Sequence, residues 1–275
     1  MRDPQWYRLF PDEDFRWSMS LRPGEADDFF EPSASAEESR ALRRKLLADH
    51  KDHYLLLPAS AEDLIQEALE RIARWTGRMF LDGHEAGSEL EPDWVLMRSD
   101  AEGRFRVEAG VVCFPSLWSL PEKAGLSLEA VHAPVPQLNE ALGRQIGAFL
   151  GKLAPGSEWE RENWGFSADG ELDHHPRLER SNLTGREPLA QVWLRLERQL
   201  FARLTGGGML FGIRVSNHRL DELTASQPGL ASRMARALRT MQEETAVYKG
   251  IAAARQGIVA SLEEKGREGG VGVDS

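Results

Sequence analysis

His132 has the clearest potential for chemistry in this chain of 275 residues, because of the side chains around it. It lies in the run Val131-His-Ala-Pro-Val-Pro136, where two prolines restrict the backbone and remove amide donors. A neutral imidazole held in a rigid, apolar turn is suited to ligating a metal, such as the iron of a haem. The continuous apolar run before it, Val111-Val-Cys-Phe114, predicts a buried strand that leads into this turn. Taken alone, this pattern leaves open an iron ligand and an ordinary turn histidine.

Other metal-ligand candidates in the chain are weaker. His174 and His175 lie in a polar loop that we expect at the surface, and the remaining histidines lack a partner at metal-ligand spacing. The single cysteine, Cys113, excludes an internal disulfide and a cluster held by four thiolates of this chain. Because Cys113 falls within a buried apolar run, we expect an inert thiol rather than a thiolate ligand of haem iron.

Composition narrows the class of protein. Hydrophobic residues make up 41% and charged residues 28%, an ordinary balance for a soluble globular protein. The net charge of −10 and the dispersed basic residues argue against nucleic-acid binding. No window approaches the roughly 18 apolar residues that span a bilayer, and the N-terminus lacks the apolar stretch of a signal peptide. We therefore expect a cytoplasmic protein without a membrane segment.

Hydrophobic periodicity predicts a mixed set of elements around these residues. Helices are expected at residues 40–53, at 60–75 with a cap at Ser60, at 138–153 and at 189–204, followed by a long C-terminal helix that carries Met234, Leu238, Met241, Tyr248 and Leu262 on one face. Strands are expected at residues 94–97, 105–107, 109–114, 159–166 and 209–215. The order of elements predicts one α+β domain, a curved and largely antiparallel sheet with packed helices.

We divide the chain accordingly. Residues 1–60 form an aromatic-rich arm and a helix that pack on the core, residues 61–265 form the main domain, and residues 266–275 form a frayed tail.

Several motifs occur in a specific order along residues 5–260. They are Cys113-Phe-Pro-Ser-Leu-Trp118, Glu122-Lys-Ala-Gly125, His132-Ala-Pro-Val-Pro136, Arg161-Glu-Asn-Trp164, Leu194-Arg-Leu-Glu-Arg-Gln199, Phe211-Gly-Ile-Arg214 and Tyr248-Lys-Gly250. Together they resemble the motifs of the haem-dependent oxidative N-demethylase family.

The resemblance implies a PAS-like fold that holds haem b in a pocket between sheet and helices. It further implies a catalytic subunit that binds dioxygen and oxidises a small secondary amine, with electrons from NADPH through partner subunits that carry FMN and a [2Fe–2S] cluster. The chain itself has neither a Gly-rich dinucleotide fingerprint after a strand nor the cysteines for such a cluster, which fits this division of labour.

The resemblance also suggests roles for individual residues. His132 would be the proximal iron ligand. Trp118 and Trp164 would line the haem pocket, although plain core packing is an equally open interpretation, and Arg161 and Asn163 would lie beside the cofactor.

Arg195, Glu197 and Arg198 form a second group of candidates. Glu197 would hold the protonated amine, and Arg195 or Arg198 would face a haem propionate or the bound oxygen. A helix surface with ion pairs is the alternative for this group.

The segment after Leu204, which reads Thr205 followed by three glycines, departs from the family pattern, and this puts the identity of the substrate in doubt. A haem-based gas or ligand sensor is the alternative function, since a PAS-like scaffold would support it equally. The absence of an output domain from the chain argues against a sensor unless it acts through a partner.

Overall fold

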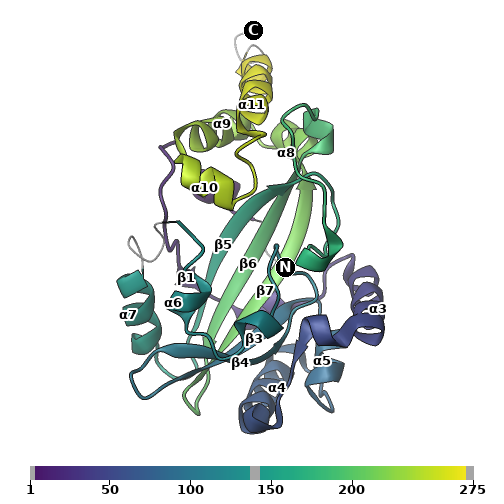
Figure 1. The fold of residues 1–275 in the computed structure, drawn as a ribbon, viewed down its shortest axis with the longest axis vertical. Coiled ribbons are helices and arrows are strands. Elements are labelled where there is room, and N and C mark those ends of the chain that lie inside the picture. Colours follow the sequence, from purple (N-terminus) through teal and green to yellow (C-terminus); the bar gives the residue numbers. More distant parts are fainter. Residues whose placement is uncertain (1–3, 137–142, 271–275) are drawn as a thin grey trace.

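The computed structural model describes residues 4–136 and 143–270. Its described part is built on a seven-stranded sheet with the order β1-β5-β6-β7-β3-β4-β2, and every pairing in it is antiparallel. The strands are β1 (Arg22–Pro23), β2 (Leu55–Leu56), β3 (Asp93–Ser99), β4 (Phe105–Val111), β5 (Glu158–Ser167), β6 (Trp193–Arg203) and β7 (Gly208–Arg219). The sheet is curved and open, so the predicted α+β class is confirmed (Figure 1).

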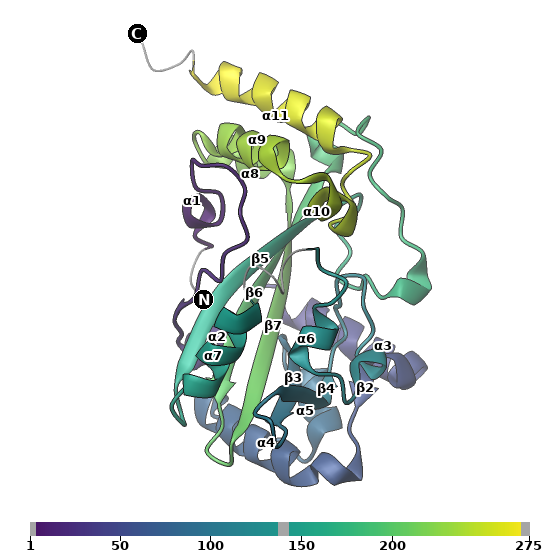
Figure 2. The same cartoon turned by 60° about the vertical axis from the view of Figure 1, so that its left-hand side comes forward.

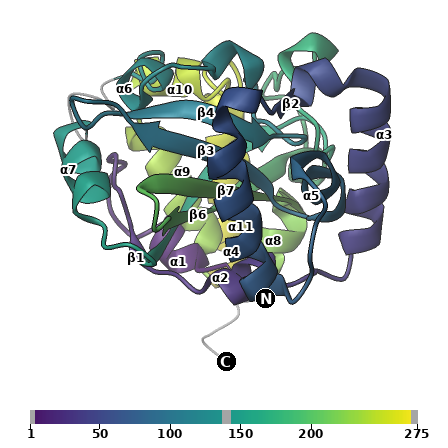
Figure 3. The same ribbon diagram turned by 90° about the horizontal axis from the view of Figure 1, so that it is seen from below.

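Helices cover the two ends of the long strands. They are α1 (Trp6–Leu9), α2 (Ala26–Phe30), α3 (Ala36–Tyr54), α4 (Glu62–Thr76), α5 (Gly83–Glu89), α6 (Leu128–Val131), α7 (Arg144–Lys152), α8 (Leu220–Ser226), α9 (Leu230–Thr240), α10 (Glu243–Tyr248) and α11 (Arg255–Gly270). Helices α8 to α11 gather beyond one end of β5, β6 and β7, whereas α3, α4 and α5 lie at the opposite end (Figure 2). Viewed from below, α7 and α3 lie on opposite flanks of the sheet (Figure 3).

The central strands carry different side chains on their two faces, because successive residues of a strand point to opposite sides. In the register of β5 with β6, Arg161 lies opposite Gln199 and Asn163 opposite Glu197. Residues directly opposite each other share a face, so these four side chains lie on one side, which we call the site face. The other face of the same strands carries Leu194, Leu196 and Leu200, which are buried in the helix-packed core.

The prediction of a helix at residues 189–204 is wrong. After a short 3-10 turn at Leu189–Gln191, this segment forms β6, which pairs with β5 and β7 along its whole length. Leu196, Leu200 and Leu204 fit a helical spacing, but they also fit a period of two. Of the polar residues between them, which suggested the outer face of a helix, Glu197 is buried on the site face and Arg198 is buried on the opposite face.

The C-terminal part also differs from the predicted single helix. Met234 and Leu238 lie on α9, Tyr248 ends α10, and Leu262 lies on α11. The helix breaks at Met241, which has an extended backbone, and again at Gly250, whose φ of +68° favours glycine. A C-terminal helix is present as α11, which continues to Gly270 into the expected tail; residues 271–275 lie outside the described part.

The remaining predictions of elements are confirmed in outline. The helices predicted at residues 40–53 and 60–75 are α3 and α4, although the residue that caps α4 is Ala61 and no side chain caps it. One strand, β4, replaces the two predicted at residues 105–107 and 109–114, and it ends at Val111. Of the helix predicted at residues 138–153, α7 covers 144–152, and 137–142 lie outside the described residues. None of the described helices is both long enough and apolar enough to cross a membrane.

Candidate functional site

Glu197 is the centre of a polar group on the site face. Its carboxylate accepts three hydrogen bonds: Oε1 from the Ser116 hydroxyl at 2.5 Å, and Oε2 from Gln199 Nε2 at 2.8 Å and from Asn163 Nδ2 at 3.3 Å. All three donors are neutral, and Glu197 is only 9% exposed. A buried carboxylate is costly without a compensating positive charge, and the nearby cations Arg161 and Lys249 sense its charge. The carboxylate is therefore fixed in orientation, yet none of the described cations is bonded to it.

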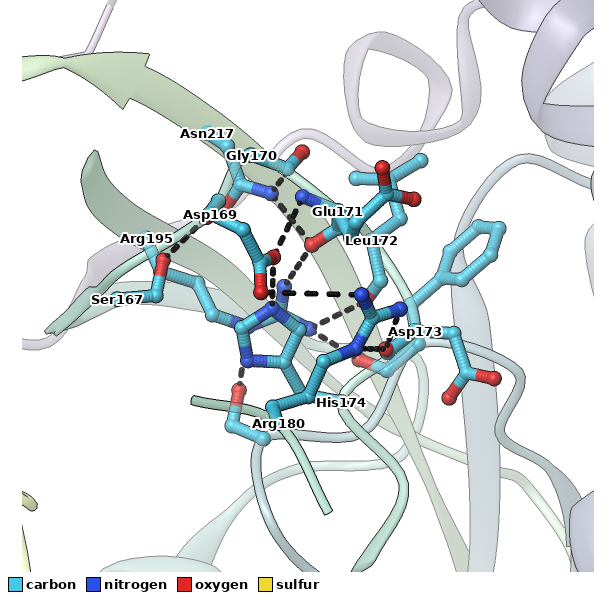
Figure 4. Close-up of polar contacts among 12 residues, drawn as sticks. Ser167, Asp169, Gly170, Glu171, Leu172, Asp173, His174, Arg180, Arg195 and Asn217 are labelled. Carbon is cyan, nitrogen blue, oxygen red and sulfur yellow. Dashed lines mark hydrogen bonds and ion pairs between the residues drawn. The ribbon is translucent and has the colours of Figure 1, made fainter. Parts of the chain in front are cut away.

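Arg195 lies beside Glu197, but all three nitrogens of its guanidinium group already donate hydrogen bonds within the protein. Its Nε donates to the Ser116 hydroxyl at 2.9 Å, and its other two nitrogens donate to the carbonyl oxygens of Phe114, Pro115, Glu171 and Leu172. Burial lowers the pKa of Arg195 to about 10, which still leaves it charged at neutral pH. Arg195 thus ties the segment after β4 and the loop after β5 to strand β6 (Figure 4).

His174 and His175 are buried, so the prediction that they lie at the surface is wrong. Each is only 5% exposed. His174 Nε2 lies 3.1 Å from Asp169 Oδ1, and Arg180 donates to the carbonyl oxygen of Asp173 beside it (Figure 4). Burial, followed by the charge of Arg195, lowers the pKa of His174, which favours a neutral imidazole. The polar side chains around these two histidines make hydrogen bonds within the protein.

Arg198 is on the opposite face of the sheet from Glu197. Its Nε lies 2.8 Å from Glu160 Oε2, and its NH2 group lies 2.7 Å from Asp28 Oδ2. These contacts place it beneath α2, 5.4 Å from the ring centre of Phe29. The structure therefore does not bring Arg198 together with the other candidate residues, and its ion pairs explain its burial.

His132 follows α6 directly, at the start of a turn. Its amide donates to the carbonyl oxygen of Leu128. The buried strand expected just before it ends at Val111, so α6 and not the strand positions this histidine. Burial, followed by the positive charge of Arg161, lowers the pKa of His132 and favours the neutral imidazole that ligates iron.

Apolar side chains between the site face and α6 and α7 remain half-buried. Trp118 is one of them, and the others are Leu128, Val131, Ile146, Phe149, Trp159, Phe201 and Phe211. This lining is large and incompletely covered, as a flat apolar cofactor requires. Trp164 faces the other side, where its ring packs against Phe10 of the N-terminal arm and against Phe166, and its carbonyl oxygen accepts a hydrogen bond from Lys249.

Two buried donors near His132 have no hydrogen-bond partner. They are Arg161 Nε and Trp17 Nε1. They are among ten buried polar side-chain atoms of the described residues that make no hydrogen bond, and an acceptor of a bound molecule would satisfy these two. A haem would fit both features, since its ring is apolar and its propionates are acceptors.

No three His, Cys, Asp or Glu side chains of the described residues gather into a group that could hold a metal ion. A porphyrin supplies four ligands to its own iron, so a single histidine is enough for the remaining axial position.

The sequence missed Ser116, Gln199, Trp17 and Lys249. Ser116 and Gln199 lie within motifs that carry the family resemblance, and Lys249 lies within Tyr248-Lys-Gly250, so their position in those motifs was a usable signal. Trp17 gave none, because aromatic residues are frequent throughout the arm.

The comparison with protein families agrees with this geometry. The family described as haem-dependent oxidative N-demethylase, alpha subunit-like, matches residues 84–259, which is more than half of the chain. The matched range contains every candidate side chain on the site face as well as His132. The description of the family points to an oxidative N-demethylase that depends on haem and has other subunits. The chain belongs to the haem-dependent oxidative N-demethylase, alpha subunit-like family.

Proposed function

We propose that this chain is the haem-binding catalytic subunit of a monooxygenase that removes a methyl group from a small secondary amine. The observation that carries the proposal is the pairing of two groups on one side of the sheet. His132 favours a neutral imidazole, and Glu197 presents a fixed carboxylate to which no cation of residues 4–136 and 143–270 is bonded. The half-buried apolar side chains lie in the same part of the fold.

His132 would ligate the iron of haem b, and the half-buried aromatic side chains would contact the porphyrin. When bound, the haem would supply the redox centre at which dioxygen is activated. The residues fit the group, because the low pKa of His132 keeps its ring nitrogen available and the unpartnered donors offer bonds to carboxylates.

Glu197 would bind the substrate amine as an ammonium ion. A carboxylate that accepts bonds only from neutral donors keeps its full negative charge for such a cation. Ser116, Asn163 and Gln199 fix both of its oxygen atoms, so the N-methyl group of a bound amine would be held in one orientation. Glu197 would also take up the ammonium proton when the amine reacts as a neutral base.

The net reaction defines the partners that the chain needs. A secondary N-methylamine, dioxygen, NADPH and one proton would give the primary amine, formaldehyde, water and NADP⁺. The alpha-subunit description of the family supports a separate partner. We assign the NADPH, FMN and [2Fe–2S] sites to that reductase partner.

The test is turnover of the haem-loaded protein with a chemical or enzymatic reductant and dimethylamine, under air. We expect formaldehyde in proportion to the electrons consumed, two per molecule. Stable binding of dioxygen or CO without formaldehyde, across a panel of small amines, would favour the sensor function and overturn the proposal.

A further inference from the structure

A cavity of about 330 Å³ lies between strand β5 and the N-terminal arm, residues 8–22. We call it the edge cavity. Arg161 and Asn163 of the site face, Lys249 after α10 and Trp17 of the arm all line it. The arm lies outside residues 84–259, so the family match includes only one wall of this cavity.

Two pairs of charged groups that line the edge cavity are bonded to each other. Arg22 bonds Glu162, and Arg16 bonds Glu13. Lys249 is different, because the only hydrogen bond of its Nζ to a described residue goes to the carbonyl oxygen of Trp164, at 2.7 Å. The side chain of Arg161 makes no hydrogen bond to any described residue. Lys249 and Arg161 therefore have no bonded carboxylate among the described residues, and Arg8, a third such cation, donates instead to the carbonyl oxygens of Ser20 and Leu21.

Lys249 is held by aromatic rings rather than by an acid. Its Nζ lies 4.4 Å from the ring centre of Trp164 and 5.7 Å from that of Trp17. Burial lowers the pKa of Lys249 to about 8; the charge of Glu197 opposes this shift and the charge of Arg161 adds to it. An ammonium group in this setting is stabilised by any anion that approaches it.

The donors without a partner point to the same cavity. Arg161 Nε and Trp17 Nε1 are both buried and make no hydrogen bond, and both residues line the cavity. A molecule that satisfied them would have to be an acceptor, and the two cations require it to be negative. A cationic amine would be repelled here, so the edge cavity is unsuited to the substrate.

The edge cavity is close to His132. Val135, three residues after His132, packs against Trp17, Met19 and Ile146. Arg161 is near enough to His132 to lower its pKa. An anionic group that reaches the edge cavity can therefore belong to a molecule that is held by His132.

We propose that the edge cavity is a carboxylate site that receives a propionate of the haem, with Lys249, Arg161 and Trp17 as its donors. The identity of the ligand rests on the proposed function, whereas the carboxylate chemistry rests on the cavity alone. Trp17 brings the arm into the cofactor site, so residues outside the matched family segment contribute to haem binding.

The experiment compares haem with its dimethyl ester, in which both carboxylates are blocked. Each porphyrin is titrated into the apo-protein and the affinity is read from the Soret band, for the wild type, Lys249→Met, Trp17→Phe and the control Lys152→Met, which alters an exposed lysine on α7. Lys249→Met is expected to weaken haem binding about 10-fold, because a bond between charged groups is lost. Neither Lys249→Met nor Trp17→Phe should change the affinity for the dimethyl ester. Thermal unfolding shows whether each variant is folded.

Equal losses for haem and the ester would show that Lys249 acts through general packing and would overturn the proposal. Unchanged affinity for both would also overturn it, while leaving haem binding by the wild type, and thus the proposed function, intact. If the wild type bound neither porphyrin, the proposed function would fail as well.

A free carboxylate is the competing source of the same chemistry. Acetate titrated into the apo-protein, followed by tryptophan fluorescence, serves as the probe. Weakened acetate binding in Lys249→Met together with unchanged haem affinity would assign the cavity to a small free acid and overturn the propionate assignment.

Discussion

The Ser116 hydroxyl lies 2.5 Å from Glu197 Oε1 and joins two segments that are 81 residues apart in the chain. Ser116 also accepts a hydrogen bond from Arg195 Nε, and Arg195 is anchored by four backbone carbonyls. The carboxylate is thus connected through one hydroxyl and one guanidinium to the backbone of two loops. Its position is set by these loops as much as by strand β6.

Replacing Glu197 by glutamine should impair the reaction without loss of haem. The amide keeps the size of the side chain but cannot hold an ammonium ion, so we expect kcat/KM to fall about 30-fold, the equivalent of about 2 kcal/mol for a bond to a charged group. Formaldehyde production at several amine concentrations measures the effect. Glu179→Gln is the control, because Glu179 is an exposed residue of the loop after β5. Similar losses in both variants would contradict a specific role for Glu197.

Replacing Ser116 by alanine should have a smaller effect of the same kind. Glu197 would keep its bonds to Asn163 and Gln199, so we expect kcat/KM to fall by about 5-fold, in line with roughly 1 kcal/mol for one hydrogen bond. Arg195 would lose one acceptor among five. Unchanged kinetics in the folded variant would show that the carboxylate does not need this hydroxyl.

Arg195 and Arg198 should be separable by their effects on activity. Arg195→Met should lower both stability and turnover, because it removes the link to the Ser116 segment. The free energy of unfolding should fall by about 3 kcal/mol, as it does when a buried, multiply bonded charge is removed. Arg198→Met breaks the ion pairs to Glu160 and Asp28 on the opposite face, so it should lower stability and leave the KM for the amine unchanged. Urea unfolding and steady-state kinetics check both. A raised KM in Arg198→Met would contradict this separation.

Cys113 should be inert in the folded protein. It is fully buried, and burial raises the pKa of its thiol to about 12, so the reactive thiolate is essentially absent at neutral pH. We expect a thiol reagent to label Cys113 only at the rate of unfolding, and Cys113→Ala to keep the wild-type haem spectrum. Rapid labelling in native buffer, or a changed Soret band in the variant, would show that the thiol reaches solvent or iron.

The stability of the chain should decrease in mild acid. Burial lowers the pKa values of His174, His175 and His218, so the unfolded chain binds protons near pH 6.5 that the folded chain does not. Stability from these groups is complete above about pH 6.5 and is lost as the pH falls through their lower folded-state values. Urea unfolding measured between about pH 5 and 7.5 gives the slope of the unfolding free energy against pH. This slope should be shallower for His174→Gln than for His84→Gln, an exposed control. Identical slopes would contradict the burial of His174.

The sequence predicts the fold class and the strands that surround the site, but not strand β6. Val95, Phe166 and Ile213 lie in segments whose apolar or alternating pattern is clear, and these segments are strands. In β6 the site face carries Arg195, Glu197 and Gln199, which favour helices in isolation. Their burial depends on Ser116 and Asn163 from distant segments, and no local pattern reports such contacts.

The site shows the same division between local and long-range information. His132 and Glu197 could be selected from the sequence, because each lies in a short motif that carries the family resemblance. The separation of Arg195 from Arg198 could not be predicted, since it requires β6 to be a strand whose neighbours point to opposite faces. The edge cavity could not be predicted either, because Trp17 and Lys249 are brought together only by the fold.

The most direct test of the account is the haem spectrum of His132→Gly with and without added imidazole. The wild-type ferrous protein is expected to show a five-coordinate haem with an iron–histidine stretching band in its resonance Raman spectrum. In His132→Gly that band should disappear, and imidazole should restore it, because the free ligand occupies the space left by the side chain. An unchanged iron–histidine band in the variant without imidazole would contradict His132 as the ligand of the iron.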